Sequence, residues 1–484
     1  MRKIFLLLAL IILSVSSAAA QSSTPAATPD TPQPGAPGIG DPLYPDFGNG
    51  GYDAQHYTLD LTVDPASDTI TGDVTMQADA TQDLSAFDLD FMGFQIDSIQ
   101  VNAQPATFTH DGHELAITPA APIPNGSAFT SEVRYQGVPQ SMTSSAVPIQ
   151  TGWIPYRGAA NCPCSYALSE PDGSADWFPV NDHPLDKATY TFQVTVPKPY
   201  NVAANGDLKQ IIDNGSTTTT ITEVTEPMAS YLATVDISQF DMVTETGTHG
   251  VPIRNYFEKG IPQATRDLFE QQDAMIGYFE TLFGAFPFDV YGALMLNTHT
   301  GGALEAQTLS IFGTDSVSAD NNQSELVIAH ELSHQWFGDS VSLADWQDIW
   351  LNEGFATYAE ALWIEHTEGS AAFQRWISYY YDQLRQNAAE PPAKPAANDL
   401  FNGSVYYRGA LTLQALRTQM GDDQFFALLK AWAADHQYGN GTTADFIALA
   451  NQISGSDLSD LFNRWLYQTP LPPASDVGIS SPSS

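Results

Sequence analysis

The sequence predicts an α+β chain with more than one domain, in which an all-β region is followed by a mainly helical region. Between about residues 42 and 245, short runs of alternating apolar and polar residues are separated by turns rich in Gly, Pro, Asn and Asp. This pattern is typical of antiparallel strands. From about residue 246, apolar residues recur mainly at helical spacing. The 484 residues are enough for two hydrophobic cores.

The first region is predicted to be a series of strands. Tyr57, Leu59, Leu61 and Val63 alternate with polar residues, which predicts that one face of this strand is buried. The later runs also end at turn residues. They cover residues 70–76, 89–99, 114–118, 129–135, 188–196, 217–224 and 229–235.

The second region begins with a predicted strand at 253–257, a helix at 264–283 and a strand at 293–297. Polar residues at 321–324 then offer a cap for a helix that continues to Phe337, because Gly338 follows. Another helix is predicted from Asp348 to Glu365. Helical sequence continues to about Tyr467, before a cluster of prolines.

The strongest chemical signal lies on the two helices around residues 330 and 353. His330, Glu331 and His334 form a His-Glu-x-x-His pattern, and Glu353 follows after 18 intervening residues. Side chains four residues apart share a helix face, so both histidines can bind one metal ion. Glu331 points about 100° away and can reach a water without binding the metal. Two imidazoles and one carboxylate favour a single Zn²⁺, with Glu331 as general base.

An alternative explanation of the histidines is a buried helix in which they are ordinary core residues. The helical context and the carboxylate on a second helix favour the metal site instead. The eight histidines outside the motif have no ligand spacing and are expected to be structural or exposed.

With these motifs, the chain resembles the gluzincin metallopeptidases of the aminopeptidase N and leukotriene A4 hydrolase type. The resemblance covers about residues 43–470, and its most specific parts are His330 to Gly338 and Trp350-Leu-Asn-Glu-Gly-Phe-Ala356. The segment Gly301-Gly-Ala-Leu-Glu305 resembles the family's Gly-x-Met-Glu-Asn motif. It implies that Glu305 holds the free α-amino group of the substrate, and that Gly302 and Ala303 border the substrate. Leu304 and Ala306 depart from the usual Met and Asn.

Two more roles are implied by the resemblance. Tyr406, in Tyr406-Tyr407-Arg408-Gly409, would stabilise the tetrahedral intermediate; Tyr407 competes for this role, but the register of the motif favours Tyr406. Glu170, in Ser169-Glu170-Pro171-Asp172, would share the amine with Glu305. Apart from the resemblance, Glu170 also fits an ordinary turn.

The resemblance implies a saddle-like N-terminal β domain at 42–245 and a thermolysin-like catalytic domain at 246–473. Residues 474–484, after the prolines, are expected to be a disordered tail. It also implies an aminopeptidase that removes N-terminal residues from peptides, with no family-type C-terminal helical domain in this chain. A zinc endopeptidase or a peptidase of relaxed specificity with an open cleft is the first alternative, because Ala306 departs from the motif. A catalytically silent, exported binding protein is the second.

The beginning of the chain has the composition of a targeting segment. Basic residues, an apolar run and small residues predict a signal peptide at 1–20 that is cleaved after Ala20. Residues 21–41, rich in Pro, Ser, Thr and Ala, are predicted to be a disordered linker. We therefore expect a secreted protein, with the periplasm or the cell surface as alternatives. No later apolar run has the length of a membrane span.

The charge is strongly acidic, with 17 Lys and Arg against 56 Asp and Glu and a formal net charge of −39. This argues against nucleic acid and anionic membranes as partners. The scarcity of basic residues is compatible with a secreted enzyme that tolerates either high salt or mild acid. A monomer is favoured. Cys162 and Cys164, the two cysteines, either form a small disulfide or remain thiols.

Overall fold

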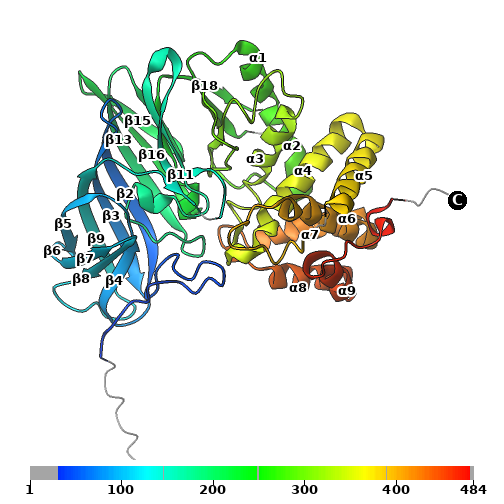
Figure 1. Cartoon of the computed structure of the whole chain (residues 1–484), viewed down its shortest axis with the longest axis horizontal. Helices are drawn as coiled ribbons and strands as arrows, with labels where there is room; N and C mark the ends of the chain where they lie inside the picture. Colours follow the sequence, from blue (N-terminus) through cyan, green and yellow to red (C-terminus); the bar gives the residue numbers. More distant parts are fainter. Residues whose placement is uncertain (1–30, 145, 248–249, 388–389, 480–484) are drawn as a thin grey trace, which may run out of the picture. The chain divides into compact units, whose positions relative to one another are not determined.

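The computed structural model describes residues 31–144, 146–247, 250–387 and 390–479. The expected signal peptide, residues 21–30 of the expected linker and residues 480–484 of the expected tail lie outside the described residues. Within the described part, a strand-rich region precedes a mainly helical one (Figure 1). The predicted fold class is therefore confirmed.

The largest sheet of the first region has eight strands among the described residues. Neighbouring strands are antiparallel except for β13 and β2, which run parallel. The order is β15 (Asp207–Asp213), β16 (Thr217–Met228), β13 (Ala188–Pro197), β2 (Tyr52–Asp64), β3 (Thr69–Ala80), β9 (Ala128–Gly137), β5 (Gln95–Val101) and β6 (Gln104–Pro105). Tyr57, Leu59, Leu61 and Val63 of β2 are buried while their neighbours are more exposed, as the alternation predicts.

Two smaller sheets complete the first region. One has the order β1 (Gln33–Pro34), β4 (Leu84–Asp90), β8 (Glu114–Thr118) and β7 (Thr107–Asp111). The other has the order β10 (Met142–Thr143), β11 (Gln150–Arg157), β12 (Pro163–Leu168), β17 (Val235–Ser238) and β14 (Asn201–Ala204). The chain leaves the end of β12 at Leu168 and passes directly into the turn that carries Glu170.

The second region combines a sheet with a group of helices. Its sheet has the order β18 (Phe240–Thr246), β19 (Pro252–Glu258), β20 (Ala293–Met295) and β21 (Ser310–Phe312), and β22 (Ser342–Leu343) pairs separately with β23 (Asn440–Gly441). The helices are α1 (Gln263–Arg266), α2 (Gln272–Phe283), α3 (Ser324–Ser333), α4 (Trp350–Glu368), α5 (Ser370–Gln386), α6 (Gly409–Met420), α7 (Asp422–Asp435), α8 (Thr443–Ser454) and α9 (Ser459–Phe462).

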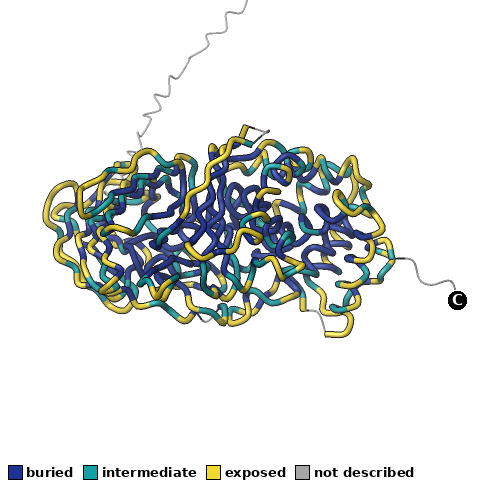
Figure 2. The backbone as a smooth tube through the Cα atoms, turned by 90° about the horizontal axis from the view of Figure 1, so that it is seen from above, coloured by how far each residue is buried: buried dark blue, intermediate teal, exposed yellow. Residues whose placement is uncertain are grey.

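Buried residues run through the interior of both regions (Figure 2). One cluster of buried apolar side chains includes strands of the first region and helices of the second. Polar contacts join the same parts. The ammonium of the half-buried Lys187 donates to the carbonyls of Asp339 and Ser340, at 2.8 and 3.1 Å. Asn352 Nδ2 donates to the hydroxyl of Tyr231 at 3.3 Å.

Strand pairing and buried contacts differ from three predicted domain limits. β18 pairs with β19, so the boundary between the two regions lies before Phe240 rather than at 245. Residues 32–41 are part of the fold rather than linker, because β1 pairs with β4 and the buried Asp41 carboxylate accepts from the backbone N–H of Trp346 at 2.8 Å. In the expected tail, Val477 is fully buried. Composition does not reveal such pairing with distant residues.

Four predicted elements also differ. The run at 89–99 is divided between β4 and β5, which belong to different sheets, with a turn at Gly93 (φ 74°) between them. The run at 229–235 contains a 3-10 turn, Ser230–Leu232, before β17 begins. The helix at 264–283 is interrupted by a 3-10 segment between α1 and α2. The helix predicted to reach Phe337 ends at Ser333.

Two further observations concern the described residues only. Cys162 and Cys164 are free thiols in the structure and do not form the small disulfide that was the other alternative. In the described ranges, none of the helices combines the length and the apolar character needed to cross a membrane.

Buried carboxylates near the start of β13 give a testable pH dependence. Burial raises the pKa of Asp182 to about 7 and that of Asp186 to about 8. The folded chain therefore keeps protons that the unfolded chain, with an Asp pKa of about 3.9, has lost. Their contribution to stability is full below pH 4 and is lost as the pH rises through 7 to 8.

We expect the parent protein to lose stability relative to Asp182→Asn between pH 4 and 7, by up to about 1.4 kcal/mol per pH unit. Thermal unfolding midpoints of both proteins across this range measure the difference. A difference that does not change with pH would show that Asp182 is ionised in the folded state.

Candidate active site

Helices α3 and α4 bring the three predicted metal ligands together. Nε2 of His330 lies 3.1 Å from Oε2 of Glu353, and Nε2 of His334 lies 3.5 Å from the same oxygen. The potential ligand atoms of the three residues all lie within 4.8 Å of one another, and all three side chains are buried. Two imidazoles and one carboxylate are a donor set that suits Zn²⁺. The residues therefore fit this ion.

Both histidines are oriented by contacts on their other ring nitrogen. Nδ1 of His330 donates to Oε1 of Glu360 at 2.7 Å, and Nδ1 of His334 donates to the carbonyl of Phe337 at 2.9 Å. Because Nδ1 of each ring carries the proton, Nε2 keeps a free lone pair, and this atom faces Glu353. Glu360 was not among the predicted site residues.

Replacing Glu360 with Gln is expected to lower zinc affinity by about 10- to 100-fold, because an orienting acceptor of a metal-binding histidine is weakened. Competition with a chelator of known affinity measures this. Glu368→Gln, at an exposed position on the same helix, is the matched control and is expected to bind zinc like the parent. Equal affinities for both variants would mean that Glu360 does not hold the ring.

Tyr406 lies on a π-helical turn, Ser404–Arg408, that leads into α6. Such turns frequently occur at functional sites. The ring of Tyr406 stacks on His330, with centroids 6.1 Å apart. The buried Arg408 holds the turn, because its guanidinium donates to backbone carbonyls that include those of Trp465 (2.8 Å) and Arg464 (2.9 Å).

Two motif glycines explain why this turn comes so close to the metal ligands. Gly354, next to Glu353, packs against Gly409 of α6. A Cβ atom added at either position would lie 2.9 Å from the Cα atom of the other. Real Cβ contacts are not that short, so a larger side chain would push α4 and α6 apart.

Glu305 and Glu170 meet beside the metal-binding group. Carboxylate oxygens of Glu170, Glu305 and Glu353 lie within 4.8 Å of one another, and Glu305 forms a similar group with Glu331 and His334. Glu305 is 2 % exposed. Oε1 of Glu305 and Oε1 of Glu170 are buried without a hydrogen-bond partner among the described residues. Such atoms are rare in folded proteins and point to a ligand that supplies donors.

The electrostatics of the site favour cations. Burial raises the pKa of Glu305, and burial together with the nearby Glu305 and Glu353 raises the pKa of Glu170 well above its ordinary value. Burial also raises the pKa of Glu331 to about 8, although the two histidines of the motif oppose this effect. A metal ion and a substrate ammonium would both relieve the repulsion among these carboxylates.

Tyr406 remains a neutral donor in this environment. Burial and the negative charge of Glu353 raise the pKa of its phenol well above its ordinary value. The hydroxyl therefore keeps its proton at neutral pH and can donate a hydrogen bond to an oxyanion.

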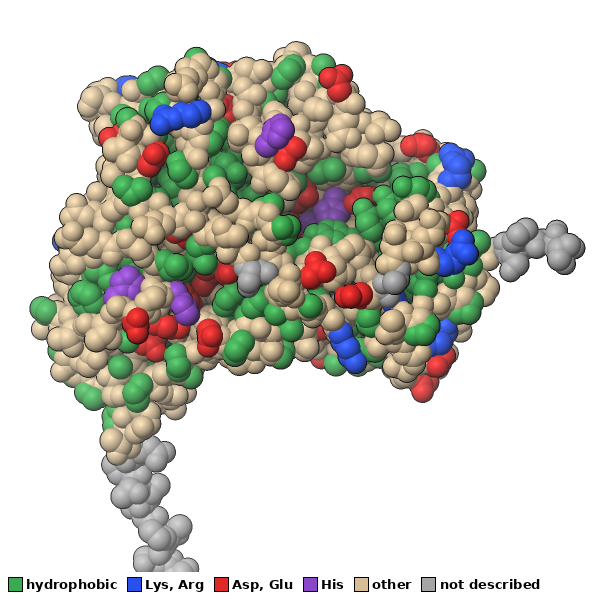
Figure 3. Space-filling view, in the orientation of Figure 1, with side chains coloured by type: hydrophobic (Ala, Val, Ile, Leu, Met, Phe, Trp, Pro, Cys, Tyr) green, Lys and Arg blue, Asp and Glu red, His purple; other side chains and the backbone are tan. Residues whose placement is uncertain are grey.

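A cavity of about 260 Å³ adjoins Glu170, and its wall also includes Gly302, Ala303 and Tyr406. A Cβ atom added at Gly302 would meet open space, which is in keeping with its place on the cavity wall. On the face drawn in Figure 3, histidine and acidic atoms are visible at the bottom of a hollow flanked by hydrophobic side chains. A recess with this chemistry therefore opens to solvent.

All nine predicted site residues thus lie around one location, and their roles stay predictions. Sequence reasoning missed Glu360, although it lies seven residues after Glu353, two helical turns further along the same face. It also missed Asp339, whose two carboxylate oxygens are buried without a hydrogen-bond partner among the described residues. Burial raises the pKa of Asp339 well above its ordinary value, with a further contribution from Glu305.

Comparison with known proteins identifies the two regions. The Peptidase family M1 domain matches residues 268–465, and the Peptidase M1 N-terminal domain matches residues 53–232. The M1 zinc metallopeptidase from Deinococcus radiodurans is 32% identical, with a TM-score of 0.82 over 90% of this chain and 98% of that chain. A mutant of that enzyme has been solved bound to a Tyr-Ser-Ala substrate.

Similar curated relatives are longer. Glutamyl aminopeptidase from Homo sapiens is 26% identical over 344 residues, which are 64% of this chain and 35% of the relative. Aminopeptidase M1 from Arabidopsis thaliana is 26% identical over 326 residues, 63% of this chain and 36% of the relative. The chain thus spans about a third of the length of these relatives. Both of its regions match the same family, at 32% identity to a solved member along almost all of that member. The chain therefore belongs to peptidase family M1.

Proposed function

We propose that this protein is a zinc-dependent aminopeptidase that hydrolyses the first peptide bond of peptides with a free amino terminus. The observation that carries the proposal is the pair of carboxylates next to the metal-binding group. Glu170 and Glu305 each present a buried oxygen without a hydrogen-bond partner among the described residues. They lie within 4.8 Å of Glu353, so an ammonium held by them would be very close to the metal ligands.

His330, His334 and Glu353 would hold one Zn²⁺ per chain. When bound, the ion supplies a Lewis acid that polarises the substrate carbonyl and acidifies a water. Glu331 is the general base that takes a proton from the attacking water and returns it to the leaving amine. Tyr406 donates its hydroxyl hydrogen to the oxyanion that forms at the carbonyl.

We call the pair Glu170 and Glu305 the amine grip, and it determines which peptide bond is cut. An ammonium between Glu170 and Glu305 would complete the unsatisfied oxygens and reduce the repulsion between the carboxylates. Because this grip lies beside the metal ligands, the bond that reaches Glu331 is the first one after the amine. An internal segment of a chain has no ammonium to offer at this position.

The cavity beside Glu170 is the place for the side chain of the first residue. Apart from Glu170 and the backbone of the glycine-rich segment, its wall is largely apolar and includes Ile149, Leu168 and Phe401. No Lys or Arg side chain belongs to this wall among the described residues. We therefore expect apolar first residues to be preferred over acidic ones, because a buried carboxylate would find no cation there.

A matched pair of peptides tests the proposed function. One peptide has a free amino terminus, and the other is identical but acetylated. The zinc-loaded protein is expected to cleave only the free peptide. Glu305→Gln is expected to lower kcat/KM for that peptide by about 10²- to 10³-fold, because a buried partner of the ammonium is removed.

The other outcomes separate the alternatives. Equal cleavage of both peptides would indicate an endopeptidase or a peptidase of relaxed specificity, with the role of Glu305 wrongly assigned. Cleavage of neither peptide, with zinc bound, would favour a silent binding protein. The Ala at position 306, where the family motif has Asn, motivates the first of these alternatives.

We also propose that the protein is exported. Support comes from the basic, apolar and small-residue segments at 1–20 and from the scarcity of Lys and Arg. Determining the amino-terminal residue of the protein recovered from its native host tests this proposal. An uncleaved terminus inside the cell would contradict it.

A further inference from the structure

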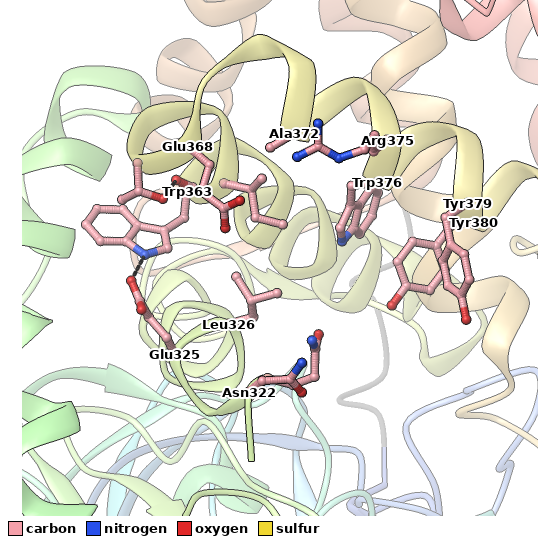
Figure 4. A pocket seen from close by; sticks show the side chains of 13 residues that line it. Asn322, Glu325, Leu326, Trp363, Glu368, Ala372, Arg375, Trp376, Tyr379 and Tyr380 are labelled. Atoms are coloured by element: carbon pink, nitrogen blue, oxygen red, sulfur yellow. Dashed lines mark hydrogen bonds between the residues drawn. The ribbon is translucent and has the colours of Figure 1, made fainter. Parts of the chain in front are cut away.

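A second cavity, of about 790 Å³, lies away from Glu170 and Glu305, between α3, α4 and α5. Its lining includes Leu326 near the beginning of α3, Ile364 near the end of α4, and Trp376, Tyr379 and Tyr380 of α5. Figure 4 shows the aromatic side chains of α5 on one wall and Leu326 opposite them. We refer to this cavity as the distal groove.

The distal groove contains an unsatisfied donor and an exposed aromatic ring. Trp376 is only 8 % exposed, yet its Nε1 has no hydrogen-bond partner among the described residues. A buried indole N–H usually has an acceptor, so this one points to a ligand that brings a carbonyl. Tyr379 is 58 % exposed and offers a ring for apolar contact.

A row of aromatic contacts joins the distal groove to the candidate active site. Trp376 packs on Tyr380, with centroids 4.5 Å apart, and Tyr380 stacks on Tyr407 at 4.0 Å. Tyr407 lies 6.5 Å from Tyr406, which stacks on His330 at 6.1 Å. The groove is therefore connected with the metal-binding residues through packed side chains.

The distal groove begins near the earlier histidine of the metal-binding motif. Glu305 groups with Glu331 and His334, so the grip is near the later histidine of the motif. Leu326 precedes His330, the earlier histidine, by four residues, which is one helical turn or about 6 Å. A peptide that starts at the grip and passes His330 toward the beginning of α3 would cover this 6 Å with about two extended residues.

We propose that the distal groove binds the carboxyl-terminal part of peptide substrates, beginning about two residues beyond the bond that is cut. This inference rests on the proposed function. The indole N–H of Trp376 donates to a backbone carbonyl of the peptide, and Tyr379 packs against an apolar or aromatic side chain. The lining carries charges of both signs, with Arg375 alongside Glu325 and Glu368. The substrate class is peptides of about five or more residues rather than dipeptides.

Two variants test the groove, and a third is the control. Trp376→Phe keeps a ring but removes the N–H, and Tyr379→Ala removes an exposed ring. Phe108→Ala, at a 40 % exposed aromatic on β7 in the first region, is the matched control. Each protein is assayed with a leucine anilide and with a six-residue peptide that has the same first residue and a Phe at its fourth position.

The parent is expected to cleave both the leucine anilide and the hexapeptide, and its KM for the hexapeptide is the reference value. Each groove variant is expected to lower kcat/KM for the hexapeptide about 3- to 10-fold, through a higher KM. This is the effect expected for the loss of one hydrogen bond or aromatic contact. Anilide turnover should stay at the parent level, and Phe108→Ala should match the parent with all substrates. Equal loss for anilide and hexapeptide, or no loss for either, overturns the inference.

Binding separates this inference from the proposed function. Calorimetry measures the affinity of the hexapeptide for the zinc-loaded Glu331→Gln protein with and without Tyr379→Ala. Weaker binding in the double variant supports the groove whether or not the parent shows turnover. If the parent cleaves no free-amine substrate but this difference is present, the proposed function fails and the groove stands. If cleavage occurs and the affinities are equal, the groove fails alone.

Discussion

The Glu331→Gln variant is expected to lose about 10³-fold in kcat while keeping the zinc content of the parent. Positioned general bases typically contribute 10²- to 10⁴-fold, and Glu331 lies on α3 between the two histidines of the motif, at ligand distance from His334. The amide has nearly the same shape as the carboxylate but cannot accept the proton from the attacking water. Steady-state kinetics with a free-amine peptide and elemental analysis of the same sample measure both quantities.

The zinc content of the Glu331→Gln variant distinguishes a general base from a metal ligand. If Glu331→Gln loses the metal along with activity, Glu331 is a ligand rather than a base, since Glu331 also groups with Glu305 and His334 at ligand distance. If kcat stays within about 3-fold of the parent, another group takes the proton. His334→Ala is the comparison that should lose zinc, because it removes one of the three expected ligands.

The second large effect is expected for Tyr406→Phe. Removing one donor to a developing oxyanion typically lowers kcat by about 10²- to 10³-fold, with little change in substrate affinity. Tyr406 is suited to this role because its ring stacks on His330 and its hydroxyl keeps its proton. The phenylalanine variant keeps the ring and loses only the donor.

Its neighbour on the same turn provides the control. Tyr407 stacks on Tyr380 at 4.0 Å, so its ring faces a different partner from that of Tyr406. Tyr407→Phe preserves this stack and is expected to leave kcat within about 3-fold of the parent for an anilide substrate. If Tyr407→Phe shows the large loss and Tyr406→Phe does not, the register of the motif has been assigned to the wrong tyrosine.

Much of the architecture follows from local patterns. The alternation in β2 predicts its buried face, since a strand repeats every two residues. The spacing of His330 and His334 predicts that both reach one metal, because a helix repeats every 3.6 residues. The structure places these side chains beside Glu353, Glu305 and the other predicted site residues, although local patterns alone do not bring separate segments together.

The errors have a common physical origin in pairing between distant segments. Residues 32–41 have the composition of a linker, yet β1 adds to the edge of β4 and Asp41 accepts from Trp346, about 300 residues later. Neither contact leaves a local mark in the sequence. The distal groove was missed for the same reason. It depends on how α5 packs beside α3 and α4, and aromatic residues such as Tyr379 look locally like ordinary core residues.

The contacts between the two regions have a consequence for how the molecule folds and evolves. Lys187, from the strand-rich region, donates to the carbonyls of Asp339 and Ser340 just after the metal-binding helix. The hydroxyl of Tyr231 accepts a hydrogen bond from the side-chain amide of Asn352, next to Glu353. A catalytic region without these partners would lose the donor to the Ser340 carbonyl and the acceptor of the Asn352 amide, close to the residues that must hold the metal in place. The two regions therefore form one cooperative unit with a shared core. We therefore expect that neither region folds stably when it is expressed without the other.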